Sequence, residues 1–272
     1  MMIDVLGAPL YAYTGGRPLQ ADRPTVVMIH GVLNDHSVWI LQSRYLAHHG
    51  FNVLAIDLPG HGRSAGNAPA SVEEAARTVL ALLDALGVAQ AALVGHSWGS
   101  LIALQAAADA PQRVTHLALV GTAYPMRVSP ALLEASLHDP RRAIDMVNVF
   151  SHSTLAPPPS ALGPGTWLYG ASRALMHAVL ASNAQVNVFH RGFLACDRYQ
   201  GGEAAARALR CPVQFILGTR DQMTPPKAAQ PLIDAAHAAG VPVDVVHIPA
   251  GHALMTEAPD GVLDALRRGL QA

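Results

Sequence analysis

The sequence predicts an α/β protein with a doubly wound, mostly parallel sheet and one helical insertion. Two observations carry this prediction. Short β-branched, apolar runs alternate with Ala- and Leu-rich segments of helical length, and this alternation breaks only between residues 124 and 200. Strands that alternate with helices favour βαβ units, in which helices cover both faces of a parallel sheet.

Composition and charge bound the class of protein. With 51% hydrophobic and 14% charged residues, a chain of 272 residues can bury a large core. A net charge of −1 offers no basic surface for nucleic acid or an anionic membrane, and no apolar run approaches the ~20 residues of a membrane span. We therefore expect no nucleic-acid or membrane partner.

Neither the cysteines nor the histidines form a recognisable framework. Cys196 and Cys211 are too few for a disulfide scaffold, and the start of the chain lacks a basic region followed by an apolar run. We therefore expect a cytoplasmic protein. The 14 histidines are scattered without metal-ligand spacing, so we expect neither a metal nor another cofactor.

The first third of the chain reads as two strand–helix units. Each strand ends in a polar or glycine-rich loop, namely His30-Gly31 after the first and the segment from Asp57 to Ser64 after the second. Ser71 with Glu74 fits a capping box at the start of the second helix. The expected elements are strands at 25–29 and 51–56 and helices at 37–49 and 71–86.

The stretch from residue 91 to residue 108 has the pattern of a nucleophile elbow. An apolar strand (91–94) precedes Gly95-His96-Ser97-Trp98-Gly99, and an apolar helix (101–108) follows. In such an elbow a sharp turn lifts the serine above the sheet. Glycine is expected at Gly95 and Gly99 because the strand and the helix pass too close there for a Cβ atom.

After another strand at 114–120 the alternation stops until residue 201. This region contains Pro157, Pro158, Pro159 and Pro164 and helical patches at 131–137, 142–150 and 171–184. It predicts a helical lid over 124–200, inserted into a core formed by 1–123 and 201–272. Strands at 211–217 and 243–248 and helices at 226–239 and 259–270 complete the core.

A serine hydroxyl needs a base to become nucleophilic, and the base needs an acid to orient it. Asp221 follows the strand that contains Val213, and His252 follows the strand that begins at Val243. Carboxyl ends of parallel strands meet at one edge of a sheet, so both should lie near Ser97. Asp57 is a rival acid, although its glycine-rich surroundings suggest a structural turn.

Two further histidines, His30 and His96, adjoin the motifs, and we expect them to hold loops by hydrogen bonds. In the lid, His152, His177, His190 and Arg191 could contact substrate, but solvated or packed side chains are the commoner case.

Together these pieces resemble the enzymes of the α/β-hydrolase fold, in the branch of esterases and cofactor-free haloperoxidases. The matching motifs are His30-Gly31, Asp57-x-x-Gly60-x-Gly62-x-Ser64, Gly95-His96-Ser97-Trp98-Gly99, Gly218-x-x-Asp221-x-x-x-Pro225 and Gly251-His252. The resemblance implies Ser97 as the nucleophile, His252 as the general base and then acid, and Asp221 as the residue that fixes the imidazole. It also implies an oxyanion hole from the backbone amides of Val32 and Trp98. The His-Gly-Gly-Gly motif of one lipase branch is absent, because Val32-Leu33 follows Gly31.

The expected function is hydrolysis of a small-molecule carboxylic ester through an acyl-serine. Serine at the elbow speaks against haloalkane dehalogenases and epoxide hydrolases, which use aspartate there. Amide, lactone and carbon–carbon bond hydrolysis and perhydrolysis stay open on the same residues, as does a non-catalytic receptor. The elbow also resembles that of prolyl aminopeptidases, which normally have glycine at the position of His96 and an acidic lid that is not identifiable here.

The substrate pocket is expected to be small and largely apolar. Its acyl-binding part would include lid residues such as Leu175, Met176, Val179 and Leu180. The oligomeric state is left open. The side chains expected to line the pocket are Leu33, Trp167, Phe189, Met223, Leu254 and Met255.

Overall fold

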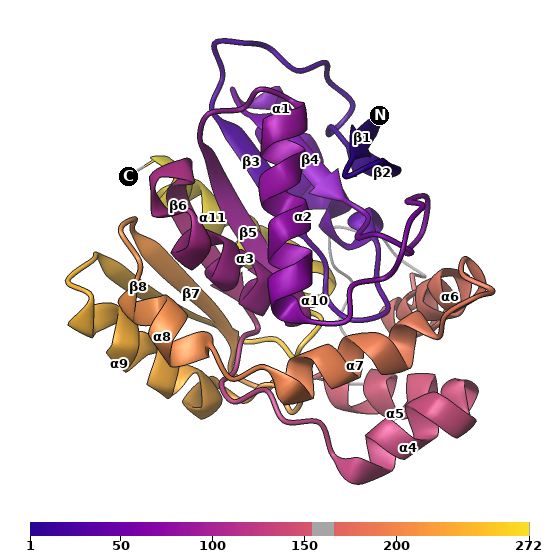
Figure 1. Ribbon diagram of the computed structural model, residues 1–272. Helices are drawn as coiled ribbons and strands as arrows, with labels where there is room; N and C mark the ends of the chain where they lie inside the picture. Colours follow the sequence, from indigo (N-terminus) through magenta and orange to yellow (C-terminus); the bar gives the residue numbers. More distant parts are fainter. Residues whose placement is uncertain (154–165, 272) are drawn as a thin grey trace.

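The computed structural model describes residues 1–153 and 166–271, and in this part of the chain eight strands form one twisted sheet (Figure 1). The strand order is β1-β2-β4-β3-β5-β6-β7-β8. Every neighbouring pair from β4 to β8 in this order is parallel. β1 pairs antiparallel with β2, and β2 pairs antiparallel with β4. This confirms the mostly parallel sheet. The strands are β1 (Met2–Val5), β2 (Ala8–Tyr13), β3 (Thr25–Ile29), β4 (Asn52–Ile56), β5 (Ala91–His96), β6 (Val114–Val120), β7 (Val213–Gly218) and β8 (Val243–Ile248).

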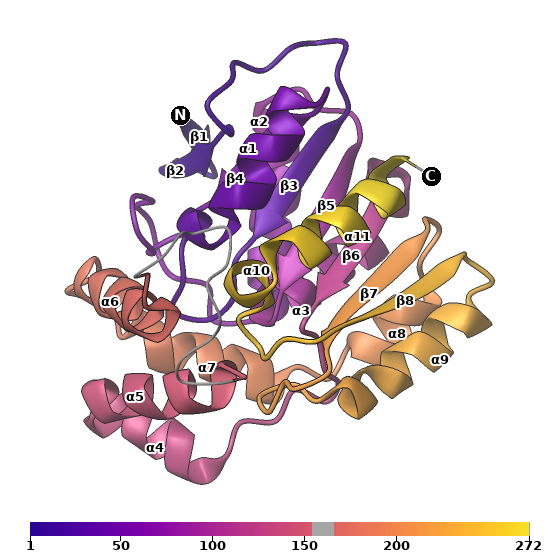
Figure 2. The ribbon, with the colours of Figure 1, turned by 180° about the vertical axis from the view of Figure 1, so that it is seen from behind.

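Helices cover both faces of the sheet because the central strands are apolar on both sides. In β3, Val27 and Ile29 belong to one core, and Val26 and Met28 belong to the other. Figure 1 shows the first face and Figure 2 the second. The first core is closed by α2 (Val72–Ala85), α3 (Trp98–Asp109), α8 (Gly202–Arg207) and α9 (Gln230–Ala238), and the second by α1 (Ile40–His48), α10 (Leu254–Glu257) and α11 (Pro259–Gln271).

Short 3₁₀ turns complete the core. The predicted helix at 37–49 divides into one such turn and α1, and Ser71 caps α2 by accepting from the Glu74 amide at 3.2 Å, as predicted. The 3₁₀ turns are η1 (His36–Trp39), η2 (Pro111–Arg113) and η3 (Pro226–Ala229).

The hairpin of β1 and β2 was not predicted from the sequence. Its two-residue turn has positive φ at both central residues, 54° at Leu6 and 79° at Gly7, which is the backbone of a type I′ turn. Asn-Gly would have signalled this turn, whereas Leu-Gly does not. Burial of alternate side chains, among them Ile3 and Leu10, fixes the hairpin against the first core.

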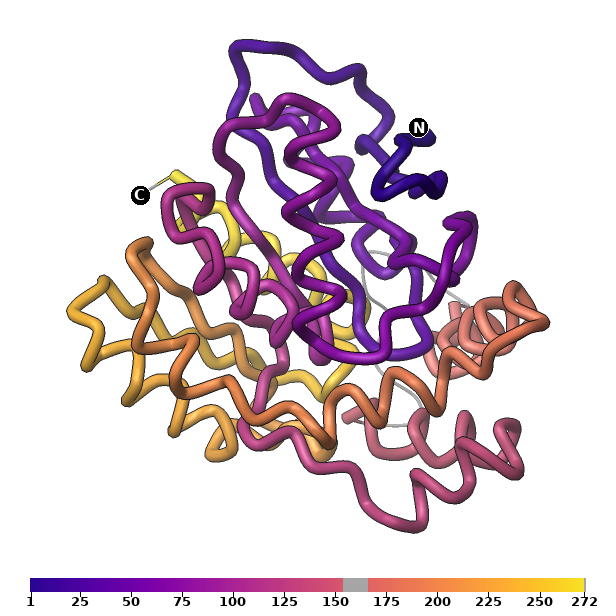
Figure 3. The backbone as a smooth tube through the Cα atoms, viewed as in Figure 1, coloured from indigo at the N-terminus to yellow at the C-terminus, as the bar shows by residue number. Residues whose placement is uncertain are grey.

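The insertion between β6 and α8 is helical and lies beyond the carboxyl ends of the parallel strands (Figures 1 and 2). Figure 3 traces the chain leaving the sheet after β6 and returning along the last of these helices. We call them the cap helices; the last one was not predicted. The proline run at 157–159 and Pro164 lie outside the described residues. The cap helices are α4 (Pro130–His138), α5 (Pro140–Ser151), α6 (Leu168–Ala181) and α7 (Val188–Arg198).

A division at residues 124 and 200 remains a prediction. Among the described helices, none is long and apolar enough to cross a membrane.

Glycines permit the close packing of β5, α3 and the end of β3. A Cβ atom on Gly95 would collide with the backbone of Gly99 and Ser100, and one on Gly99 would collide with the carbonyl oxygens of Ile29 and His30. These contacts are to backbone atoms, which cannot rotate away. The predicted close passage of the elbow strand and its helix is therefore confirmed at Gly95, whereas at Gly99 the close neighbour is the end of β3.

We expect Gly99→Ala to lower the free energy of unfolding by several kcal/mol, on the order of the cost of overpacking or more. Gly261→Ala is the matched control, because a Cβ there meets only side-chain atoms of Ile248, the nearest at 3.4 Å. Alanine in this helical position should leave stability unchanged or raise it by up to about 1 kcal/mol. Urea unfolding of both variants tests this, and equal stabilities would contradict the packing account.

Candidate active site

Ser97 sits at the turn between β5 and α3 in a strained conformation. Its φ is 53° and its ψ is −119°, a region that residues with a side chain rarely adopt. The Ser97 amide donates to the Val120 carbonyl at 2.9 Å, and its own carbonyl accepts from the Ser100 amide at 2.9 Å. Backbone bonds on both sides therefore hold the turn, and Ser97 faces the cavities described below.

His252 and Asp221 form a buried pair at the same edge of the sheet. Nδ1 of His252 lies 2.8 Å from Oδ2 of Asp221, and the two side chains are 8% and 0% exposed. The Met223 and Thr224 amides donate to the other carboxylate oxygen of Asp221, both at 2.8 Å. The loop after β7 thus fixes the carboxylate from its own backbone.

The electrostatics of this pair decide which imidazole nitrogen carries a lone pair. Burial alone would raise the pKa of Asp221, but His252 and the hydrogen bonds from Thr224 outweigh burial and lower it. An ionised carboxylate only accepts hydrogen bonds, so Nδ1 of His252 donates. In the neutral ring Nε2 then holds the lone pair and can accept a proton.

Thr224 is a third member of this group that sequence analysis left unassigned. Its hydroxyl oxygen lies 2.7 Å from Oδ2 of Asp221, 3.0 Å from Nδ1 of His252 and 2.9 Å from the Gly121 carbonyl oxygen. The signal in the sequence was a threonine three residues after Asp221, the spacing at which an Asp side chain receives local amides.

The loop that carries His252 is bound to the core and to a cap helix. Nε2 of His96 donates to the His252 carbonyl at 2.9 Å, and the Ala253 amide donates to the Ser151 carbonyl at the end of α5 at 3.0 Å. The Glu257 carboxylate accepts from the Gly251 amide at 2.5 Å and from the Ser153 amide at 2.7 Å. The predicted loop-holding role thus matches the bond that His96 makes.

Val32 lines the same two cavities as Ser97, and Trp98 follows Ser97 in the chain. Among the described residues, neither amide donates a hydrogen bond to the protein, and Trp98 is the first residue of α3. Nδ1 of His30 lies 2.8 Å from the Gly31 carbonyl oxygen and Nε2 accepts from the Leu58 amide at 3.0 Å. Because the Gly31 carbonyl and the Val32 amide share one peptide plane, His30 also orients that amide.

Two cavities meet at Ser97 and His252, and Val32, Phe193 and Met223 line both of them. The first has a volume of about 250 Å³ and lies between η1, α5, α6 and α10; the second has about 260 Å³ and lies between α4, α5, α7 and the loops after β6 and β7. A substrate bound across Ser97 would therefore have one part in each cavity. We call them the first arm and the second arm.

The structure brings some of the predicted pocket residues to these arms and buries others. Met223 and Met255 line the arms, as do Leu175 and Met176. Among the described residues, neither arm includes Leu33, Phe189 or Leu254, each with no exposed area, or Trp167, which is 59% exposed.

The reasons are local. Phe189 faces the core, and Phe193, one turn further along α7, faces both arms. On α10, Leu254 is likewise buried, and Met255 lines the first arm. Leu33 has a φ of 55° that turns it into the first core, and Trp167 stacks on Tyr169 outside the arms. Val179 is buried and Leu180 packs on the core, away from both arms.

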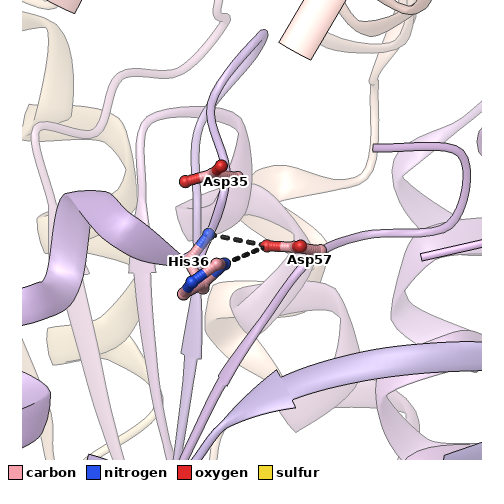
Figure 4. A group of neighbouring side chains, drawn as sticks. All are labelled: Asp35, His36 and Asp57. Carbon is pink, nitrogen blue, oxygen red and sulfur yellow. Dashed lines mark hydrogen bonds and ion pairs between the residues drawn. The ribbon is translucent and has the colours of Figure 1, made fainter. Parts of the chain in front are cut away.

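The rival acid Asp57 belongs to a different cluster, with Asp35 and His36 (Figure 4). Asp57 Oδ1 accepts from the His36 amide at 2.8 Å and lies 2.7 Å from His36 Nδ1, while Oδ2 accepts from the Arg63 amide at 2.9 Å. Burial would raise the pKa of Asp57, but these bonds lower it. Although the three residues could offer ligands to a metal ion, their bonds to the protein explain them as supports of two loops.

The structure places a strained serine between a strand and a helix, on the same two cavities as the histidine of a buried histidine–aspartate pair, at one edge of a mostly parallel sheet; this is the arrangement of the α/β-hydrolase class. The family model for the alpha/beta hydrolase fold matches residues 24–259, and the chain therefore belongs to this family of hydrolases.

Known proteins match different lengths of this chain. The dihydrolipoyllysine-residue acetyltransferase component of the acetoin cleaving system of Pseudomonas putida is 41% identical over 123 residues, 43% of this chain, but the chain spans only 33% of that relative. “Putative carbamate hydrolase RutD” of Klebsiella pneumoniae is 29% identical over 92% of both chains. A solved esterase from Exiguobacterium antarcticum superposes with a TM-score of 0.82 over 100% of this chain and 99% of its own, at 18% identity, a likeness of fold alone.

Buried histidines should make this protein sensitive to acid. Burial is the main cause that lowers the pKa of His61 and of His96 to about 3. Between pH 6.5 and 3 the unfolded chain therefore binds protons that the folded chain does not, and stability falls as the pH falls, by about 1.4 kcal/mol per pH unit for each histidine.

His61→Gln should reduce this slope by about that amount, measured by urea unfolding at several pH values. His138→Gln, at an exposed position on α4, is the control. An unchanged slope in His61→Gln would contradict the account.

Proposed function

We propose that this protein is a serine hydrolase that cleaves a small-molecule carboxylic ester through an acyl-serine intermediate. The observation that carries the proposal is the buried Asp221–His252 pair, 2.8 Å apart, at the cavities that Ser97 faces. A base with a fixed tautomer beside a strained serine is what nucleophilic acyl transfer requires.

In the proposed reaction, Oγ of Ser97 attacks the carbonyl carbon of the ester while Nε2 of His252 takes its proton. The amides of Val32 and Trp98 hold the oxyanion of the tetrahedral intermediate. His252 then gives the proton to the departing alkoxide, which leaves an acyl-serine. Water, activated by His252, attacks this ester in the same way and releases the acid and the free serine.

Asp221 stabilises the imidazolium that forms in each half of this cycle. Its lowered pKa keeps it ionised at neutral pH, and its bonds to the Met223 and Thr224 amides hold its position. The cap helices serve as a lid in this proposal, since α5, α6 and α7 provide much of the lining of the two arms.

The residues that line the two arms also help to choose between the alternative substrate classes. An aminopeptidase needs acidic side chains for a substrate amine, and among the described residues neither arm has an Asp or Glu side chain in its lining. One relative over nearly the whole chain is named “Putative carbamate hydrolase RutD”, and a carbamate is an acyl compound, which supports an acyl substrate.

Hydrolysis of p-nitrophenyl esters from acetate to long acyl chains tests the proposal. Ser97→Ala should lower kcat by about 10⁴-fold or more, and Asp221→Asn by about 10⁴-fold, because the tautomer of His252 is lost. Asp57→Asn is the matched control for the acid. It should lower thermal stability but retain kcat in the folded protein, since Asp57 bonds to His36 and Arg63. Turnover unaffected by Ser97→Ala would overturn the proposal.

Thr224 is expected to be a positioning residue. Thr224→Val keeps the shape of the side chain and removes the hydroxyl that contacts Asp221 and His252. We expect kcat to fall about tenfold with KM little changed, the size of one hydrogen bond to a charged group. Thr224→Ser should restore kcat; if Thr224→Val retains full kcat, the hydroxyl has only a structural role.

A further inference from the structure

The two arms differ in charge. Among the described residues that line them, Arg127 alone carries a permanent charge, and it lies in the second arm. It belongs to the loop that follows β6, at the sheet edge where Ser97 and His252 also lie. The first arm has apolar walls and hydroxyl or amide groups only, apart from its two histidines.

The guanidinium of Arg127 has unused hydrogen-bonding capacity. Its Nη1 donates to the Asp197 carbonyl oxygen at 3.0 Å, and within the described residues it has no ion pair with a carboxylate. One oxygen of the Asp197 carboxylate accepts from the Val128 amide at 3.0 Å, so this side chain is engaged with the backbone of the loop. A guanidinium has five N–H donors, so most of those on Arg127 remain for a ligand.

The side chains around Arg127 leave its charge as the one permanent charge that an anion in the described lining of the second arm would meet. Apolar side chains line the second arm around Arg127, among them Met126, Leu132 and Met146, and Gln222 adds an amide. An anion in this arm would meet a planar, permanently charged donor that can hold a carboxylate through two parallel N–H groups. The side chain of Arg127 is itself exposed, so an anion can reach it without a buried charge being created first.

We propose that the second arm is a subsite for an anionic group, and that the substrate is an ester with a carboxylate held by Arg127. This rests on the proposed function and names its substrate class: the hemiester of a dicarboxylic acid, or an ester whose alcohol half carries the carboxylate. The uncharged half of the substrate occupies the first arm. The expectation of a small, largely apolar pocket then applies to the first arm, because the second arm also carries a charge.

Two matched pairs of esters test the subsite. They also distinguish a carboxylate on the acyl half of the substrate from one on the alcohol half. Mono-p-nitrophenyl adipate against p-nitrophenyl heptanoate places the charge on the acyl half. Butyryl esters of 4-hydroxybenzoate and of methyl 4-hydroxybenzoate place it on the alcohol half. In one pair the wild type should show a kcat/KM about tenfold higher for the anionic ester, as expected for one charge-assisted hydrogen-bonded contact.

Arg127→Gln should abolish this preference by raising KM for the anionic ester more than KM for the neutral ester. Arg142→Gln, at an exposed position of α5 outside both arms, should keep it. Equal kcat/KM within both pairs, or a preference that survives Arg127→Gln, would overturn the subsite while ester hydrolysis by Ser97 stands. Absence of all turnover in the wild type would instead overturn the proposed function, and the subsite with it.

Discussion

The close packing of three backbone segments around Ser97 is the constraint on which the rest of the site depends. A Cβ on Gly31 would lie 3.0 Å from Nδ1 of His96 and 3.2 Å from Cβ of Ser97, and Gly95 and Gly99 have no space for one. This packing forces the turn at Ser97 to a φ of 53°. It also brings the peptide of Gly31 and Val32 against the serine, so the candidate nucleophile and a candidate oxyanion donor depend on the same contacts.

The histidine reaches this place from the other end of the chain and is bound to the cap. His96, the neighbour of Ser97, donates to the His252 carbonyl, while Ser151 and Glu257 bind the residues on either side of His252. A movement of the end of α5 would therefore move the loop of His252. This links the cap helices, which line the arms, to the geometry of the proposed base.

Sequence alone predicted the elements, and the positions of three candidate side chains at one edge of the sheet, better than it predicted the lining of the pocket. The central strands were predictable because both faces are apolar, and Ser97 and Asp221 each follow one of them. His252 follows β8, the edge strand, whose valines still mark it as a strand in the sequence. The β1–β2 hairpin was missed because Leu6-Gly7 is not a typical turn pair.

Lining residues depend on the rotation of a helix about its axis, which the sequence does not reveal. Phe193 therefore takes the place expected for Phe189. Thr224 and Arg127 went unassigned because their roles depend on residues distant in the chain. Thr224 contacts Gly121 and His252, and Arg127 lies among the residues that form the second arm.

The central claim is that the Asp221–His252 pair makes Ser97 a nucleophile, and covalent labelling tests it most directly. An organophosphonate that carries a fluorophore should modify the wild type at one site, and mass spectrometry of the digest should place the adduct on Ser97. Labelling should be abolished in His252→Gln, because the hydroxyl then has no base. An adduct at another residue, or labelling of Ser97 that continues at the same rate in His252→Gln, would contradict the account.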